Sequence, residues 1–203
     1  MIYAITKFIC RIVYGKIFST NVIGAENIPE KGAFILAANH LSNWDPPFLG
    51  TFIKREIFFM GKEELFKNPI FAWWIRGLHV FPVKRGAADK TAIKTAVKII
   101  KDGHCLGIFP EGTRSKTGKI GKAEPGVSLI AAMTKTPIIP AAIINTNKIF
   151  SAEKKFPRLA VVYGKPMNFT GSAKDKDALA NFAQSVMAEV ARLKNLAELD
   201  IRD

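Results

Sequence analysis

The segment FILAANHLSNWDP, residues 34–46, carries more information about fold and function than any other part of this chain. Its first five residues, 34–38, form a short apolar run that is typical of a buried β-strand. Ser42, Asn43 and Pro46 are residues that favour turns and helix starts, so a helix is expected to begin near Asp45. This order predicts an α/β fold in which His40 lies just past the carboxyl end of a strand, where open α/β sheets bind ligands.

His40 and Asp45 form a candidate catalytic pair. Histidine exchanges a proton near neutral pH, and a carboxylate on its second ring nitrogen would fix the tautomer and stabilise the imidazolium. On a regular helix residues five apart point away from each other, so the pair can meet only if the chain turns between them. A chance His and Asp on a surface turn is the competing interpretation. Because no Ser or Cys lies in a recognisable nucleophile motif, the pair would act on a hydroxyl of the substrate.

Size and composition restrict the possibilities further. A chain of 203 residues with 48% hydrophobic residues can form one domain with a real core, plus a small helical appendage. The net charge of +13 favours anionic partners, namely nucleic acid, anionic lipid or phosphorylated substrates. Cys10 and Cys105 lie in apolar sequence and are interpreted as core residues of a protein in a reducing compartment. His, Cys and carboxylate spacings match no metal site, so neither a metal nor a cofactor is expected.

Residues 1–20 are expected to form an amphipathic helix at a membrane interface, followed by the α/β domain in residues 21–203. Lys7 and Arg11 lie on one side of this helix, where they would meet lipid headgroups, and isoleucines surround the rest. A helix packed on the domain is the alternative. A second group of aromatic residues, suited either to a membrane interface or to the core, comprises Phe66, Phe71, Trp73 and Trp74.

The remaining sequence alternates between strand and helix patterns, which predicts a largely parallel sheet flanked by helices. The helix pattern over 62–76 contains Pro69 and should break there. The other expected strands are 22–23, 57–60, 105–109, 138–144 and 159–163, and the other expected helices are 89–102, 127–134 and 173–196.

The segment FPEGTRS, residues 109–115, is a second candidate site. Gly112 allows backbone N–H groups to approach a ligand closely, and the guanidinium of Arg114 suits phosphate oxygens. Glu111 would accept a substrate hydroxyl or hold Arg114, although a surface Glu–Arg pair on a glycine turn is the plainer alternative. The cations that could add to a phosphate site are Lys84, Arg85, Lys119 and Lys122.

Together these motifs resemble the glycerolipid acyltransferases of the 1-acyl-sn-glycerol-3-phosphate acyltransferase (PlsC) type. The His-x4-Asp pair precedes Phe-Pro-Glu-Gly-Thr-Arg-Ser as in that family, and three further blocks match in order, at residues 62–65, 77–85 and 137–141. The resemblance covers roughly residues 20–165 and rests on several ordered motifs rather than one. It implies a mixed, largely parallel sheet flanked by helices, behind an N-terminal two-helix element.

The resemblance also implies a role for each site residue. His40 is the general base and Asp45 orients it. Arg114 and Lys62 bind the acceptor phosphate, with Lys84 or Arg85 assisting. The acceptor site is shaped by Glu111, Gly112 and Thr113, and a hydrophobic wall for the acyl chain by Ile139 and Pro140.

The reaction that follows from the resemblance is transfer of a fatty acyl group from acyl-CoA or acyl-carrier protein to lysophosphatidic acid, giving phosphatidic acid. It would take place on an anionic membrane surface, at the cytoplasmic face of the cell membrane, without nucleic acid. Another lysophospholipid or glycerol 3-phosphate remains open as acceptor. A non-catalytic basic module that binds membranes or nucleic acid remains open as a different class.

Overall fold

The structure is a computed structural model that describes residues 1–84, 89–152 and 155–202, with side chains up to residue 199. Its described strands form one sheet in the order β1-β7-β6-β2-β5-β3-β4. All neighbouring strands are parallel except β6 and β7, which confirms the expected mixed, largely parallel sheet. The strands are β1 (Asn21–Ile23), β2 (Ile35–Ala38), β3 (Ile57–Lys62), β4 (Val80–Val83), β5 (Cys105–Ile108), β6 (Ile138–Ile144) and β7 (Ala160–Tyr163).

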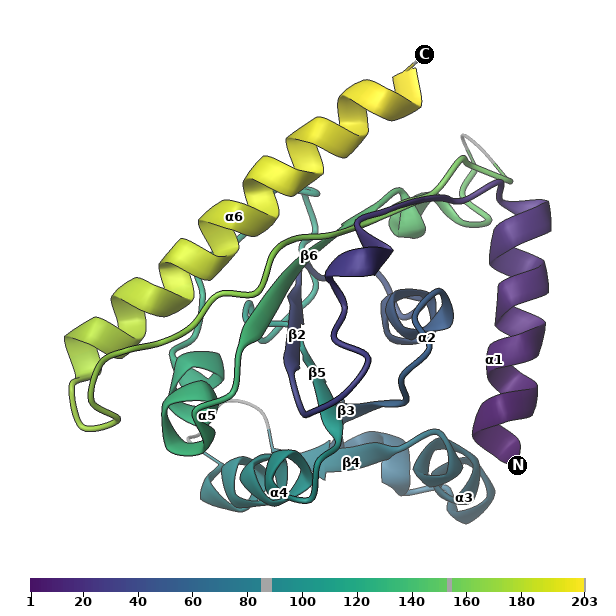
Figure 1. Cartoon of the computed structure of the whole chain (residues 1–203). Coiled ribbons are helices and arrows are strands. Elements are labelled where there is room, and N and C mark those ends of the chain that lie inside the picture. Colours follow the sequence, from purple (N-terminus) through teal and green to yellow (C-terminus); the bar gives the residue numbers. More distant parts are fainter. Residues whose placement is uncertain (85–88, 153–154, 203) are drawn as a thin grey trace.

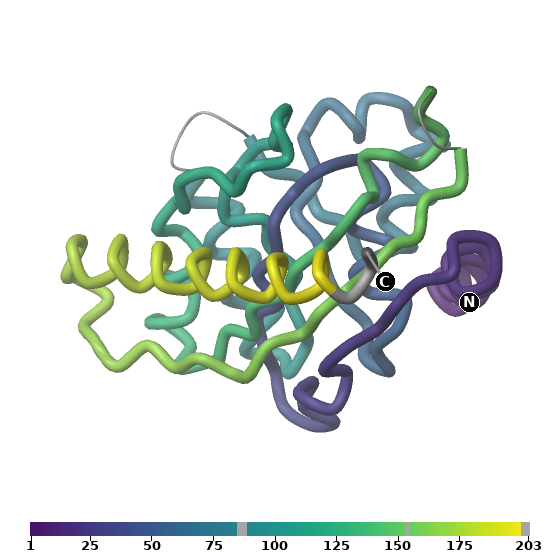
Figure 2. Tube along the Cα trace, turned by 90° about the horizontal axis from the view of Figure 1, so that it is seen from above, coloured from purple at the N-terminus to yellow at the C-terminus, as the bar shows by residue number. Residues whose placement is uncertain are grey.

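Helices cover both faces of the sheet, because successive residues of each strand point to opposite sides. In β2, Ile35 and Ala37 join the core under α4, α5 and α6, whereas Leu36 and Ala38 join the core under α2 and the N-terminal helix. Figures 1 and 2 show the resulting three layers, with α6 lying across one face. The helices are α1 (Ile2–Ile12), α2 (Asp45–Thr51), α3 (Pro69–Gly77), α4 (Lys90–Lys101), α5 (Gly126–Thr134) and α6 (Lys176–Arg202).

Most expected elements are present, and the differences have local causes. The pattern over 62–76 breaks as predicted into a 3₁₀ turn, η3 (Glu63–Phe66), and α3, which begins at Pro69 because proline suits a first helical position. β4 was not predicted. It contains Pro82 and lies at the sheet edge, the position in which a strand tolerates proline. Helix α6 continues to Arg202, beyond the predicted end.

The N-terminal segment forms one helical run, α1 followed by a π-helical turn, η1 (Val13–Ile17), rather than the two-helix element. Its inner face packs on the domain: the Tyr3 hydroxyl accepts from Ile57 N at 3.0 Å, and Lys7 Nζ donates to Arg55 O at 3.1 Å. Burial lowers the pKa of Lys7. The expectation that Lys7 meets headgroups is therefore wrong, since its ammonium group faces the protein.

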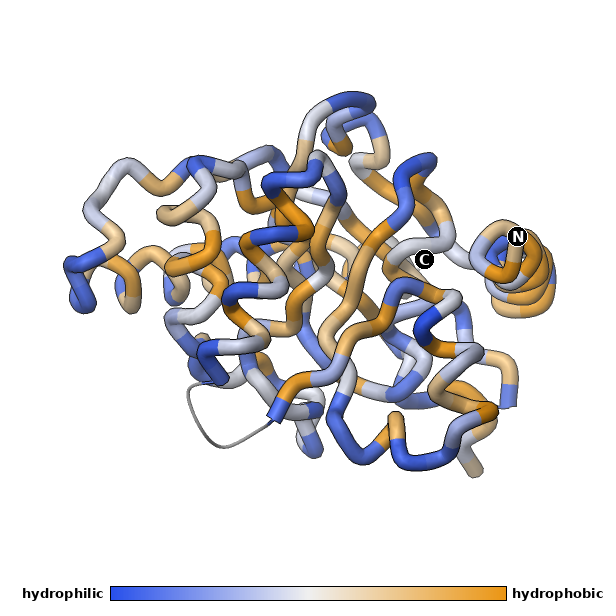
Figure 3. Tube along the Cα trace, turned by 90° about the horizontal axis from the view of Figure 1, so that it is seen from below, coloured by the Kyte–Doolittle hydropathy of each residue, from blue (hydrophilic) through white to orange (hydrophobic). Residues whose placement is uncertain are grey.

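The outer face of α1 is apolar, as the orange helix marked N in Figure 3 shows. This face exposes Ile5, Phe8, Ile9 and Ile12, and Phe8 is 65% exposed. In a soluble helix this spacing normally marks the buried side. No helix among the described residues is long and apolar enough to cross a membrane.

Candidate active site

The candidate site forms where three neighbouring strands end. β2 lies between β5 and β6 and runs parallel to both, so the carboxyl ends of all three meet at one edge of the sheet. The pairing of Ala37 with Ile108, continued along both chains, brings His40 level with Glu111. The two motifs that the sequence separates by many residues are thus adjacent, at the position where open sheets bind ligands.

The turn between β2 and α2 brings Asp45 back onto His40, with 2.7 Å between Asp45 Oδ2 and His40 Nδ1. The same oxygen accepts the N–H groups of Leu41 at 2.6 Å and Ser42 at 2.8 Å. Asp45 is fully buried and His40 is 6% exposed. A buried carboxylate requires such donors, so the turn that holds the charge also fixes its direction toward the imidazole.

The orientation of the His40 ring is fixed from a second side by Phe109. The two rings stack with centroids 4.1 Å apart and planes 15° from parallel. With Nδ1 bonded to Asp45, Nε2 has no hydrogen-bond partner among the residues that the structure describes. This atom is therefore available to accept a proton from a bound hydroxyl, as a general base requires.

The turn after β5 is joined to the His40 turn by several hydrogen bonds. Glu111 Oε1 accepts from His40 N at 3.0 Å and Glu111 Oε2 accepts from Gly121 N at 2.9 Å. Ser115 N donates to His40 O at 2.8 Å, and Arg114 Nη1 donates to Asn43 Oδ1 at 3.1 Å. Both Glu111 oxygens are thus engaged with main-chain groups, so this carboxylate holds two loops together.

Gly112 adopts a φ of +66° in the middle of this turn, a conformation that glycine adopts at little cost. Thr113 and Arg114 are exposed beside it. The plain alternative of a surface Glu–Arg pair does not describe the turn, because Glu111 bonds the main chain and Arg114 bonds the His40 turn.

The other candidate cations lie along the same edge of the sheet. Lys62 ends β3, which neighbours β5, and the register places Lys62 level with Pro110. Lys84 follows the outermost strand β4, whose last residue, Val83, pairs with Lys62. Both lysines are exposed. Arg85 lies outside the described residues. Lys62 and Lys84 therefore follow neighbouring strands at the edge of the sheet that carries the site, whereas Arg114 lies in the loop after β5 beside Asn43.

Ile139 and Pro140 do not share a surface. Ile139 belongs to the core beneath α2, whereas Pro140 Cγ lies near Gly164 and Leu193 on the α6 side. Both are buried residues of β6. Their role as an acyl-chain wall stays a prediction. Because successive side chains of a strand point to opposite faces of the sheet, Ile139 and Pro140 cannot line the same wall.

Several residues of the site were not predicted. Asn39 uses its side-chain amide to pair with the main chain of Ile143, accepting from N at 2.8 Å and donating to O at 2.9 Å. Thr146 Oγ1 donates to Asp45 Oδ1, and Phe109 stacks on His40. Asn39 and Phe109 could have been suspected from their places inside the two motifs. Thr146 lies outside both motifs.

Burial raises the pKa of the Cys10 and Cys105 thiols, which suits the structural role predicted for them rather than a nucleophilic one. The described residues contain no group of three or more His, Cys, Asp or Glu side chains placed to hold a metal ion.

The acyltransferase family model matches residues 19–144, which is more than half of the chain, and the chain therefore belongs to that family. The chain is 32% identical over 178 residues to the 1-acyl-sn-glycerol-3-phosphate acyltransferase of Bacillus subtilis (strain 168), covering 86% of this chain and 87% of the relative. The Streptococcus pneumoniae enzyme of the same name is 32% identical over 79% of this chain, which spans 60% of that relative.

Among solved structures, the chain is similar to the 1-acyl-sn-glycerophosphate (LPA) acyltransferase PlsC of Thermotoga maritima. The TM-score is 0.75 at 28% sequence identity, over 94% of this chain and 79% of the other.

Proposed function

We propose that this protein is a 1-acylglycerol-3-phosphate O-acyltransferase, which transfers a fatty acyl group from an acyl thioester to the free hydroxyl of lysophosphatidic acid and forms phosphatidic acid. The observation that supports this most is the His40–Asp45 pair, bonded at 2.7 Å and hydrogen-bonded to the turn that carries Arg114. The family membership and the names of the relatives point to the same reaction.

The chemistry follows from His40 Nε2, to which no described residue is hydrogen-bonded. The acceptor hydroxyl gives its proton to Nε2 while its oxygen attacks the thioester carbonyl, and a tetrahedral oxyanion forms. Asp45 stabilises the imidazolium produced in this step. The carbon–sulfur bond then breaks, and the imidazolium returns the proton to the departing thiolate. The substrate supplies the nucleophile, so no acyl-enzyme is required. General base catalysis of this kind contributes about 10²–10⁴-fold.

The acceptor phosphate binds at the cationic end of the site. Arg114 presents a planar donor fork beside the His40 turn, and Lys62 and Lys84 extend the positive charge along the strand ends. A phosphate held there would place the adjacent glycerol hydroxyl near His40, which converts an encounter in solution into a positioned reaction. Glu111 and Gly112 contribute by holding and shaping the turn rather than by contacting the anionic phosphate.

The lipid substrates would reach the site from a membrane surface, with the protein bound peripherally or monotopically at the cytoplasmic face. The exposed apolar face of α1 supports this, and its N-terminal end contacts α3, where Ile70 is 78% and Trp73 65% exposed. An aromatic group lies at the other end of this helical run: Trp44, which precedes Asp45, packs near Phe150 with ring centroids 6.2 Å apart, and Phe150 packs near Phe18, which follows η1. The net charge of +13 would favour anionic lipid.

Two alternatives make different predictions. A different phosphate-bearing acceptor, such as another lysophospholipid or glycerol 3-phosphate, would use the same residues. A non-catalytic module that binds membranes or nucleic acid would not need a buried, hydrogen-bonded His–Asp pair. Burying two ionisable side chains lowers the stability of the fold, and such pairs are typical of sites that transfer protons.

The test is transfer by the purified protein in detergent or vesicles, with lysophosphatidic acid as acceptor and either acyl-CoA or acyl-carrier protein as donor. Phosphatidic acid formed with one or both donors is the expected result and also identifies the donor. Transfer to another lysophospholipid in preference would correct the acceptor. Vesicle binding without transfer to any lysolipid would support the non-catalytic alternative.

A further inference from the structure

The two oxygens of the Asp45 carboxylate are held in different ways. Oδ2 accepts from His40 and from the N–H groups of Leu41 and Ser42, all within its own turn. Oδ1 accepts from Thr146, 101 positions further along the chain, and from Ser42 Oγ at a long 3.4 Å. Among the described residues, Thr146 is thus the one donor to Asp45 that comes from outside the turn.

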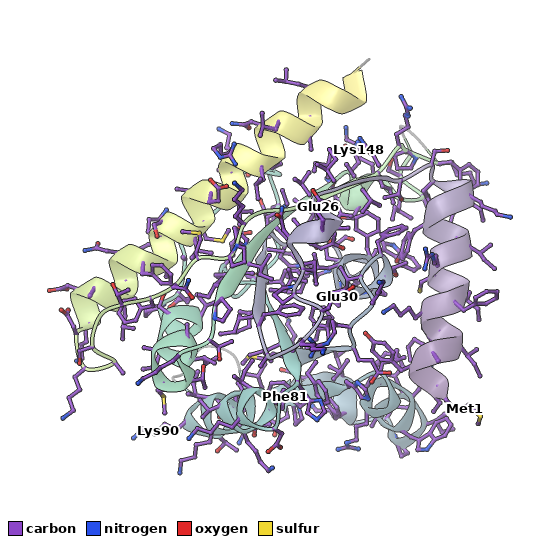
Figure 4. The ribbon with its side chains drawn as sticks, in the orientation of Figure 1. Met1, Glu26, Glu30, Phe81, Lys90 and Lys148 are labelled. Carbon is purple, nitrogen blue, oxygen red and sulfur yellow. The ribbon has the colours of Figure 1, made fainter. Side chains whose placement is uncertain are left out.

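The surroundings of Thr146 limit the hydrogen-bond partners that its hydroxyl can reach. It is fully buried at the start of a 3₁₀ turn, η4 (Thr146–Lys148), directly after β6. The turn runs outward from there, and Lys148 at its end is exposed and labelled in Figure 4. A buried hydroxyl needs a hydrogen-bond partner within the protein, and Asp45 Oδ1 is the partner of Thr146.

The position of Thr146 is itself fixed from the sheet. Asn145, between β6 and Thr146, adopts a left-handed conformation with φ +65°. Three residues before Thr146, the main chain of Ile143 is clamped by the side chain of Asn39, the residue that precedes His40. β6 and its turn therefore form a fixed support behind the His40–Asp45 pair.

We propose that Thr146 is a positioning residue for the reaction: its hydroxyl holds Oδ1 of the Asp45 carboxylate, while the N–H groups of the turn hold Oδ2, and both are needed to fix the angle that the carboxylate presents to His40 Nδ1. Without it, Oδ1 would keep, among the described residues, only the 3.4 Å contact with Ser42. The carboxylate would then be held firmly at Oδ2 alone and could tilt about that oxygen, which would disturb its hydrogen bond to the imidazole. The consequence for turnover rests on the proposed acyl transfer, whereas the consequence for the His40–Asp45 hydrogen bond does not.

The test uses Thr146→Val, which keeps the shape and removes the hydroxyl, and Thr146→Ser, which keeps the hydroxyl. Thr136→Val is the matched control, because Thr136 is also buried and lies before β6, far from the site. The Val variant at 146 should lose roughly 10- to 100-fold in kcat, as misplacement of a catalytic group does, with KM for both substrates nearly unchanged. The Ser variant should stay within about threefold of the native protein.

A second readout is independent of substrate. The proton between His40 Nδ1 and Asp45 should give a downfield ¹H NMR signal, assigned by its loss in His40→Ala. This signal should shift or broaden in Thr146→Val, and remain in place in Thr146→Ser and Thr136→Val. If Thr146→Val does not fold, Thr146→Ala gives the same comparison with a smaller side chain.

An unmoved signal in the folded Thr146 variant would overturn the proposal, and so would a kcat loss no larger than that of Thr136→Val. If the native protein shows no transfer but the signal still moves, the proposed function fails and the positioning of Asp45 by Thr146 stands.

Discussion

Asn39→Ala should destabilise the protein strongly, because the Asn39 amide stands in for a strand partner at the point where β2 ends. Two hydrogen bonds to Ile143, at 2.8 and 2.9 Å, would be lost in a place where Asn39 is 1% exposed. The N–H and C=O of Ile143 would then be buried without partners, each at a cost of about 1–3 kcal/mol. The sum, allowing for some relaxation, is a loss of about 3–5 kcal/mol in the free energy of unfolding.

Urea unfolding followed by circular dichroism, together with calorimetry, measures this loss. The melting temperature should fall by about 6–20 °C, since 1 kcal/mol corresponds to about 2–4 °C in a domain of this size. Asn39→Asp should not restore stability, because it keeps the acceptor for Ile143 N–H but places an anionic oxygen against Ile143 O. Asn195→Ala, on the exposed side of α6, is the control. A loss below about 1 kcal/mol in Asn39→Ala would show that the Asn39 amide is not an important support for the end of β2.

Two further predictions concern the cationic turn and the N-terminal helix. Arg114→Ala should raise KM for lysophosphatidic acid about tenfold, the value expected for one exposed charge-assisted contact, and leave transfer to a neutral monoacylglycerol unchanged. Equal effects on both acceptors, or an equal effect of Lys116→Ala, would argue against phosphate binding by Arg114. Phe8→Glu should weaken sedimentation with anionic vesicles about tenfold, whereas Leu196→Glu on α6 should not. Unchanged binding by Phe8→Glu would remove α1 from the membrane contact.

The parts of the fold that could be predicted depend on local patterns. The apolar run 34–38 followed by turn residues predicted β2, the turn and α2, and Pro69 correctly predicted a helix break. β4 was missed because its four residues include Pro82, and only its edge position makes that residue acceptable. The inward direction of Lys7 was missed for a similar reason. Charge predicts solvent exposure, whereas the accepting carbonyl of Arg55 comes from a distant turn.

In the site too, contacts between residues close in sequence could be predicted, whereas contacts between distant residues could not. His40 and Asp45 could be paired from sequence because the residues between them favour a turn. Glu111 was expected to meet a substrate hydroxyl or Arg114, yet its oxygens accept the main-chain N–H groups of His40 and Gly121. Almost every residue type has a main-chain N–H group, so the sequence does not reveal which of these groups will donate to Glu111. Thr146 could not be found at all, because its contact with Asp45 requires knowing that β6 pairs with β2.

The proposed mechanism depends above all on His40 taking the proton of the acceptor hydroxyl. The most direct measurement compares transfer to lysophosphatidic acid by the native protein, His40→Ala and His104→Ala, the last being an exposed histidine outside the site. His40→Ala should keep its circular dichroism spectrum and lose about 10²–10⁴-fold or more in kcat, while His104→Ala stays near the native rate. Near-native transfer by a folded His40→Ala protein would contradict the role of His40 as the general base.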